Sequence, residues 1–131
     1  MAQALTDTSA IYALIDRDDT NHRKATAILR ASIRQGITPL ITNFIVAESH
    51  ALLLSRLGAG IARDWLTKQL WSVEPITPAD VKKAKEIIQN YTDKEFSYTD
   101  ATSFAVMERL VLPAAFAFDV HFKQYGLKLL A

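Results

Sequence analysis

Four acidic residues lie beside or within apolar stretches, where an unpaired charge is unusual. Asp7 precedes TSAIYALI, Glu48 lies within NFIVAESHALLL, Asp100 lies within FSYTDATSFAVM, and Asp119 ends LPAAFAFD. Carboxylates that converge in a partly buried site repel one another, and they take up protons unless a cation compensates them. We therefore expect these four side chains to meet around a divalent metal ion.

The donor atoms of this set predict the kind of metal. All four are carboxylate oxygens, which favour Mg²⁺ or Mn²⁺ over zinc. His22, His50 and His121 have no metal-binding spacing, so we expect them at the surface or in hydrogen bonds, although His121 could approach a substrate phosphate. A metal held by carboxylates can activate water and neutralise charge on a phosphodiester.

Hydroxyl groups closely follow two of the acids. Thr8 and Ser9 come after Asp7, and Ser103 comes shortly after Asp100. Such hydroxyls can orient a carboxylate or a bound water, so we expect them to support the site.

A purely structural role is also open for three of the acids. Asp7 could cap a helix, Asp100 could complete a capping box that begins at Ser97, and Asp119 could be a turn residue at a strand end. Glu48 has no comparable alternative, because no cation follows it at the third or fourth position of its expected helix.

Short apolar runs alternate with amphipathic segments, which predicts a parallel α/β sheet covered on both faces. We expect strands at 3–6, 38–42, 71–76, 114–118 and, as an edge strand, 128–131; we expect helices at 9–16, 21–35, 43–57, 61–70, from 77 to about 90, and at 99–111.

This arrangement predicts where the acids lie. Asp7 and Asp119 follow strands, so they belong at the rim where parallel sheets bind ligands. Asp100 shares a helical stripe with residues 104, 107 and 111, and Glu48 shares one with residues 44, 52 and 55.

Composition limits the function classes. The chain has 131 residues, of which 50% are hydrophobic and 22% are charged, so we expect one domain over residues 1–131. It has no cysteine, which excludes disulfides, zinc–thiolate sites and cysteine nucleophiles. The net charge of +1 requires a nucleic-acid partner to be held by a local patch. Neither a signal peptide nor an apolar run of about 18 residues is present, so we expect a cytoplasmic protein without a membrane partner.

Several motifs resemble those of one family. They are DTSA at 7–10, a D-x-x-N-H turn ending at His22, TNFIVAE at 42–48, SYTDATSFA at 97–105 and FDVHF at 118–122. In this order they resemble the PIN domain, and within it the VapC-type ribonuclease toxins of toxin–antitoxin pairs. Many relatives carry a basic residue after the last acid, where this chain has Val120.

The resemblance implies a three-layer α/β/α sandwich with a central, mostly parallel sheet. It implies an Mg²⁺- or Mn²⁺-dependent ribonuclease in which Asp7, Asp100 and Asp119 hold the metal and Glu48 positions a second ion or the attacking water. It also implies an RNA substrate, a homodimer and a small antitoxin partner.

Two other functions remain open. A catalytically silent PIN-like module would bind RNA or protein, but the presence of all four acids favours the nuclease. A phosphatase with an aspartate nucleophile usually needs a second acid two residues later, and here position 9 is serine.

Overall fold

The computed structural model describes residues 2–130 and contains one four-stranded sheet. Its strands are β1 (Ala2–Thr6), β2 (Ile37–Thr42), β3 (Ser72–Glu74) and β4 (Ala115–Phe116), arranged in the order β3-β2-β1-β4. Every neighbouring pair is parallel, so the predicted parallel sheet is confirmed. The helices are α1 (Thr8–Ile15), α2 (His22–Arg34), α3 (Asn43–Leu57), α4 (Ala59–Lys68), α5 (Pro78–Asn90), α6 (Tyr98–Leu110) and α7 (His121–Tyr125).

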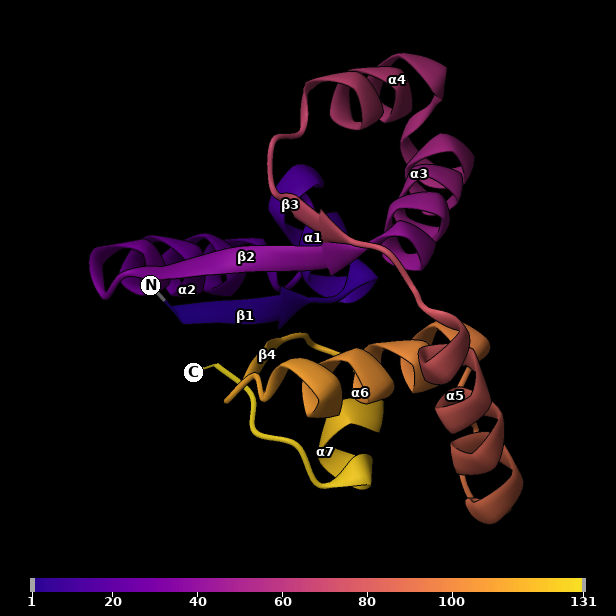
Figure 1. The fold of residues 1–131 in the computed structure, drawn as a ribbon. Helices are drawn as coiled ribbons and strands as arrows, with labels where there is room; N and C mark the ends of the chain where they lie inside the picture. Colours follow the sequence, from indigo (N-terminus) through magenta and orange to yellow (C-terminus); the bar gives the residue numbers. More distant parts are fainter. Residues whose placement is uncertain (1, 131) are drawn as a thin grey trace.

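Helices cover both faces of the sheet, which makes the expected three-layer α/β/α sandwich (Figure 1). On one face, Phe116 of β4 packs with Ala25 and Ile28 of α2. On the other face, Leu5 of β1 belongs to a cluster with Phe104 of α6.

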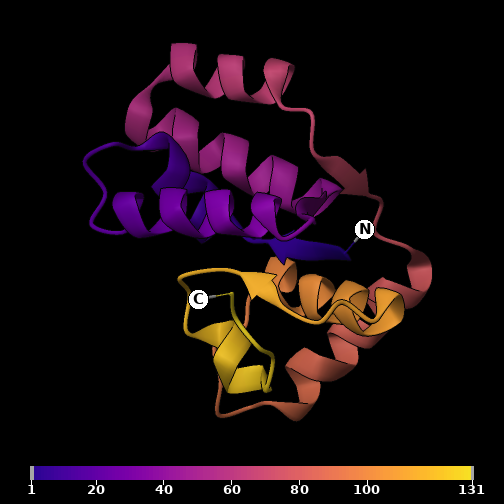
Figure 2. The same cartoon turned by 90° about the vertical axis from the view of Figure 1, so that its left-hand side faces the viewer.

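Helices α3 and α4 pack together, and α4 and α5 lie towards opposite ends of the molecule (Figure 2). The start of α3 contacts the start of α6, where the ring centroids of Phe44 and Tyr98 lie 5.3 Å apart. No helix within residues 2–130 is long and apolar enough to cross a membrane.

Local capping explains why most predicted helix starts agree with the structure to within two residues. The Thr42 hydroxyl accepts a hydrogen bond from the Ile45 N–H at the start of α3. Complete capping boxes begin α5 at Thr77 and α6 at Ser97. Gly58, at φ 95°, allows the sharp break between α3 and α4.

The C-terminal prediction was less accurate. Only residues 115–116 of the predicted strand 114–118 form a strand, because the Phe118 N–H donates to the Ser9 side chain and the chain leaves the sheet. The predicted edge strand 128–131 is reduced to a single bridge between Ala115 and Leu129, and Ala131 lies outside the described residues. Helix α7 was not predicted.

The predicted stripe on α6 was also wrong at its last position. Asp100, Phe104 and Met107 are buried as expected. Val111 instead ends the helix in the left-handed region, at φ 53°, and is 83% exposed.

An ion pair between the buried Asp80 and the partly exposed Arg109 fixes α5 against α6. The Arg109 guanidinium donates to Asp80 Oδ1 at 3.0 Å and Oδ2 at 2.9 Å, and to Glu74 Oε2 at 3.1 Å. Burial alone would raise the pKa of Asp80, but the bonds from Arg109 and Thr77 outweigh it and lower that pKa. The pair holds the helix whose first turn carries Asp100.

Candidate active site

The four predicted acids meet in one open pocket of about 390 Å³ at the carboxyl ends of β1 and β4. Its lining comprises Asp7, Thr8, Ser9, Glu48, Leu52, Ser97, Asp100, Asp119 and His121. Four segments therefore build it: the start of α1, one side of α3, the start of α6 and the loop between β4 and α7.

Asp7 is the most buried of the four acids, at 3% exposure. Its Oδ2 accepts hydrogen bonds from the Ser9 hydroxyl at 2.8 Å and from the Ser9 N–H at 3.2 Å. Burial raises the pKa of Asp7 to about 7, against the Ser9 hydrogen bonds, and the charges of Asp100 and Glu48 raise it further. A cation in the pocket would therefore stabilise the ionised form of Asp7.

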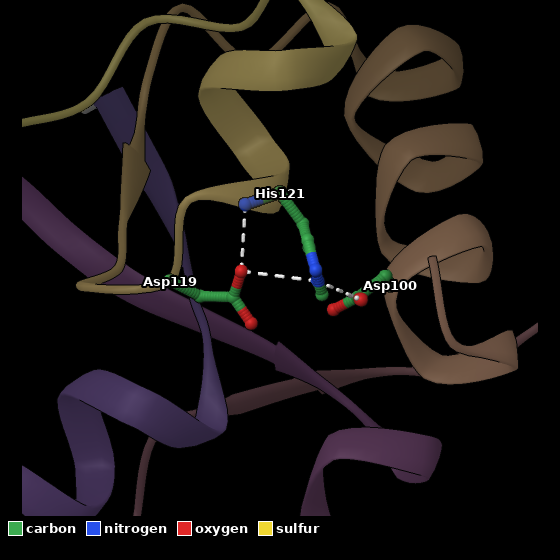
Figure 3. A group of neighbouring side chains, drawn as sticks. All are labelled: Asp100, Asp119 and His121. Atoms are coloured by element: carbon green, nitrogen blue, oxygen red, sulfur yellow. Dashed lines mark hydrogen bonds and ion pairs between the residues drawn. The ribbon is translucent and has the colours of Figure 1, made fainter. Parts of the chain in front are cut away.

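Asp100, Asp119 and His121 form a tight group in the pocket (Figure 3). His121 Nδ1 lies 2.7 Å from Asp100 Oδ2 and 3.1 Å from Asp119 Oδ1. The backbone N–H of His121 donates to the same oxygen, Asp119 Oδ1, at 2.6 Å. An ionised carboxylate can only accept, so the tautomer that fits two ionised acids here is the one in which Nδ1 is the donor.

Glu48 reaches the pocket from α3. It is half-buried and lies next to Leu52 in the lining. The buried face of α3 carries Ile45, Ser49 and Leu53, so Glu48 faces the pocket rather than the core. Near it the Ser49 hydroxyl donates to Thr8 Oγ1 at 3.1 Å, which ties α3 to the start of α1.

The structural roles considered for the three aspartates are also present, and each occupies one oxygen. Asp7 caps α1 through Oδ2, Asp100 completes its capping box through Oδ2, and Asp119 accepts in its turn through Oδ1. The other oxygen of each accepts no hydrogen bond from any residue between 2 and 130. Capping therefore orients these side chains and leaves one oxygen of each for a ligand.

The predicted supporting hydroxyls divide into two groups. Thr8 and Ser9 line the pocket, and Ser9 also accepts from the Phe118 N–H, which joins Asp7 to the loop that carries Asp119. Ser103 does not line the pocket: its hydroxyl is buried in α6 without a hydrogen-bond partner among the described residues.

His121 lies in the pocket and hydrogen-bonds there, whereas its spacing predicted only a surface or hydrogen-bonding residue that could approach a substrate phosphate. We expected oxygen donors only, whereas an imidazole nitrogen lies between two of the acids. Its sequence signal was the spacing of two residues after Asp119, followed by Phe122, which is fully buried and anchors α7.

The donor set fits a hard divalent ion. Three carboxylates each offer a free oxygen, Glu48 adds a fourth carboxylate, and one donor atom each from Asp100, Asp119 and His121 lie within 4.8 Å of one another. Oxygen-rich sets of this kind suit Mg²⁺ or Mn²⁺.

Comparison with known proteins agrees with this geometry. The family model for the PIN domain matches residues 4–128. The chain is a PIN-domain protein. This PIN domain is 31% identical over 123 residues, 92% of each protein, to the 23S rRNA-specific endonuclease VapC20 of Mycobacterium tuberculosis, in strains CDC 1551 / Oshkosh and ATCC 25618 / H37Rv.

A solved structure shows the same fold. The crystal structure of Mycobacterium tuberculosis VapC20, described as a toxin that cleaves the sarcin–ricin loop, superposes on this PIN domain with a TM-score of 0.85. The match covers 95% of each chain at 28% identity. The resemblance to the PIN domain and to VapC-type toxins is thereby confirmed.

Proposed function

We propose that this PIN domain is a metal-dependent endoribonuclease that hydrolyses RNA phosphodiester bonds and acts as the toxin of a toxin–antitoxin pair. The observation that carries the proposal is the single pocket in which Asp7, Asp100 and Asp119 each keep one oxygen free, with Glu48 beside them. The similarity to the endonuclease VapC20 supports the same activity.

Asp7, Asp100 and Asp119 would hold Mg²⁺ or Mn²⁺. Such an ion, when bound, activates water and neutralises charge on the phosphodiester. Glu48 would accept a hydrogen bond from the attacking water, because it lines the pocket and has no hydrogen-bond partner of its own among the described residues. Ser9 holds Asp7 in place, and His121 holds Asp100 and Asp119 at a fixed separation.

We infer that the substrate is 23S rRNA, since the similar endonuclease VapC20 is specific for it. The same relationship supports cleavage in the sarcin–ricin loop, an antitoxin as partner and a cytoplasmic site of action. A homodimer is proposed on the resemblance to the family.

The test is cleavage of two RNAs by the purified protein: a stem-loop with the sarcin–ricin loop sequence, and a mixed RNA pool. Each is incubated with Mn²⁺, with Mg²⁺ and with chelator, beside the Asp100→Asn variant. We expect metal-dependent cleavage of the stem-loop that the variant lacks. Cleavage of the pool alone would support the nuclease activity and contradict the proposal that 23S rRNA is the substrate. A folded protein that cuts neither RNA would be the silent binding module.

A further inference from the structure

We propose that a second pocket, beside the acidic one, binds a nucleotide of the RNA that flanks the cleaved bond. The proposal rests on the function proposed above and assigns residues for holding the substrate. The second pocket has a volume of about 320 Å³, at the lower end of the range of roughly 300–1,000 Å³ for ligand pockets.

The two pockets are continuous. Ser9, Leu52 and Asp119 line both of them. A strand of RNA whose scissile phosphate lies at the acids would therefore place a neighbouring nucleotide at the second pocket.

Two helices extend from one pocket to the other. On α3, Glu48, Leu52 and Arg56 follow one another at four-residue spacing and so lie on one face, with about 12 Å between the first and the last along the axis. On α1, Ser9 and Tyr12 are one turn apart. The acid lies at one end of this double row, and a cation and an aromatic ring lie at the other.

Arg56 has the chemistry of a phosphate contact. Among the described residues that line either pocket it is the only lysine or arginine. It forms no ion pair within 4.0 Å in residues 2–130, and its guanidinium carbon lies 5.2 Å from the centroid of the Tyr12 ring. The charge of Arg56 also acts on Asp16, but from beyond ion-pair distance. A planar guanidinium that is held over a ring without a direct ion pair suits a phosphate oxygen.

The rest of the pocket has the chemistry of a base site. Tyr12, Phe118 and Leu52 supply two aromatic rings and an apolar wall. The Tyr12 hydroxyl donates to Asp16 Oδ2 at 2.5 Å, which fixes the ring. Stacking of a base on an aromatic side chain is worth about 1–3 kcal/mol and tolerates any base.

Polar groups for a base edge come from the loop before α2. Asn21 lines the pocket, and its side-chain amide makes no hydrogen bond with another described residue. Its backbone N–H donates to Asp19 Oδ2 at 3.0 Å, which orders the loop and engages one oxygen of that carboxylate. The amide offers both a donor and an acceptor, as hydrogen bonding to a base edge requires.

The experiment measures RNA binding separately from cleavage. The probe is the fluorescently labelled sarcin–ricin stem-loop, with Ca²⁺ in place of Mn²⁺, and anisotropy gives the dissociation constant at several salt concentrations. The variants are Arg56→Gln and Tyr12→Leu. The control is Arg63→Gln, an exposed arginine on α4, and Tyr12→Phe, which keeps the ring, is compared with Tyr12→Leu.

We expect Tyr12→Leu to weaken binding by roughly five- to 150-fold, the range for loss of one stacked base. Arg56→Gln is expected to weaken binding and to reduce the slope of log K against log salt by about 0.7, the value for one phosphate contact on a single strand. Arg63→Gln should bind as the wild type does. Tyr12→Phe keeps the ring but loses the bond to Asp16, so it should weaken binding less than Tyr12→Leu. An abasic nucleotide next to the cleaved bond should weaken wild-type binding and add nothing in Tyr12→Leu.

Cleavage with Mn²⁺ distinguishes failure of this proposal from failure of the proposed function. In one outcome the wild type cleaves the stem-loop, but Arg56→Gln and Tyr12→Leu bind it with unchanged affinity and salt dependence. This outcome would contradict the proposed nucleotide site and support the proposed nuclease activity. If the wild type binds the stem-loop without cleaving it and the variants bind more weakly, the nucleotide site is supported and the nuclease activity is contradicted. Absence of RNA binding by the folded wild type would overturn both.

Discussion

Asp7 caps helix α1, and its surroundings disfavour the ionised form of its carboxyl group. Its cap requires only an oxygen acceptor, which an asparagine also supplies. Its burial and the nearby charges of Asp100 and Glu48 raise its pKa from 3.8 to about 7. The ionised form of Asp7 therefore costs stability in the metal-free protein.

The first prediction concerns Asp7→Asn in metal-free protein. Because the folded-state pKa lies above the unfolded value, the stabilisation from Asp7 is complete below about pH 4 and is lost as the pH rises to 7. The free energy of unfolding of the wild type should therefore fall relative to the variant by up to about 4 kcal/mol between pH 4 and pH 8. Urea unfolding with chelator at both pH values measures it.

The control for this measurement is Asp64→Asn, an exposed acid on α4, which should follow the wild type at both pH values. A pH dependence of Asp7→Asn identical to that of the wild type would contradict the raised pKa.

At the scale of elements, α6 is held at both ends by interactions of different range. The capping box at Ser97 fixes its start locally. Arg109, in its last turn, pairs with Asp80 of α5 and with Glu74 of β3. The ion pair positions the helix on the sheet, and the cap orients Asp100 towards the pocket.

The second prediction is that Arg109→Met destabilises the protein by roughly 2–4 kcal/mol at pH 7. The change leaves the buried Asp80 carboxylate without its cation, and partial exposure of Arg109 keeps the cost below that of a fully buried pair. The pKa of Asp80 is lower in the folded protein than in the unfolded chain. The ionised Asp80 carboxylate therefore stabilises the fold above its unfolded-state pKa, and this stabilisation is lost as the pH falls. The loss in the variant should therefore shrink in acid, as urea unfolding at pH 3 and pH 7 would show.

The third prediction concerns the end of α6. Val111 is β-branched and adopts φ 53°, where a Cβ costs about 1–2 kcal/mol. Val111→Gly should raise the free energy of unfolding by about 1 kcal/mol, because this exposed side chain loses little packing. Val120→Gly is the matched control: it is also exposed but has φ −69°, and it should destabilise. Equal effects of the two changes would exclude relief of backbone strain.

At the scale of the molecule, the acidic pocket joins four segments that are distant in sequence. Residues 7–9 of α1 lie against α3 through the Ser49–Thr8 hydrogen bond and against the 118–119 loop through Ser9. An ion held by acids from these segments binds the folded chain and not the unfolded one. Metal binding should therefore stabilise the whole fold.

The fourth prediction follows from this linkage. Mn²⁺ at 100 times its dissociation constant should raise the free energy of unfolding by about 2.7 kcal/mol. Asp100→Asn should lose most of this increase, while Glu86→Gln, an exposed change on α5, should keep it. Thermal unfolding across a Mn²⁺ titration provides the measurement. Equal stabilisation of wild type and Asp100→Asn would place the metal elsewhere.

Much of the fold follows from the sequence alone, because the interactions involved are local. The helices that begin at Thr77 and Ser97 are specified by capping residues three positions apart. The alternation of strands and helices requires a parallel sheet, and that sheet places Asp7 and Asp119 at the same rim. The helical stripes of Glu48 and Asp100 predicted that these two acids join them.

The remaining features depend on which distant segments pack together. His121 lies between Asp100 and Asp119 because the chain leaves the sheet after two residues of β4 and forms α7. Arg109 finds Asp80, and Arg56 finds Tyr12, only once their helices are packed. The contacts of His121 with Asp100, of Arg109 with Asp80 and of Arg56 with Tyr12 each join residues more than 20 positions apart, which hydrophobic periodicity and capping motifs do not pair.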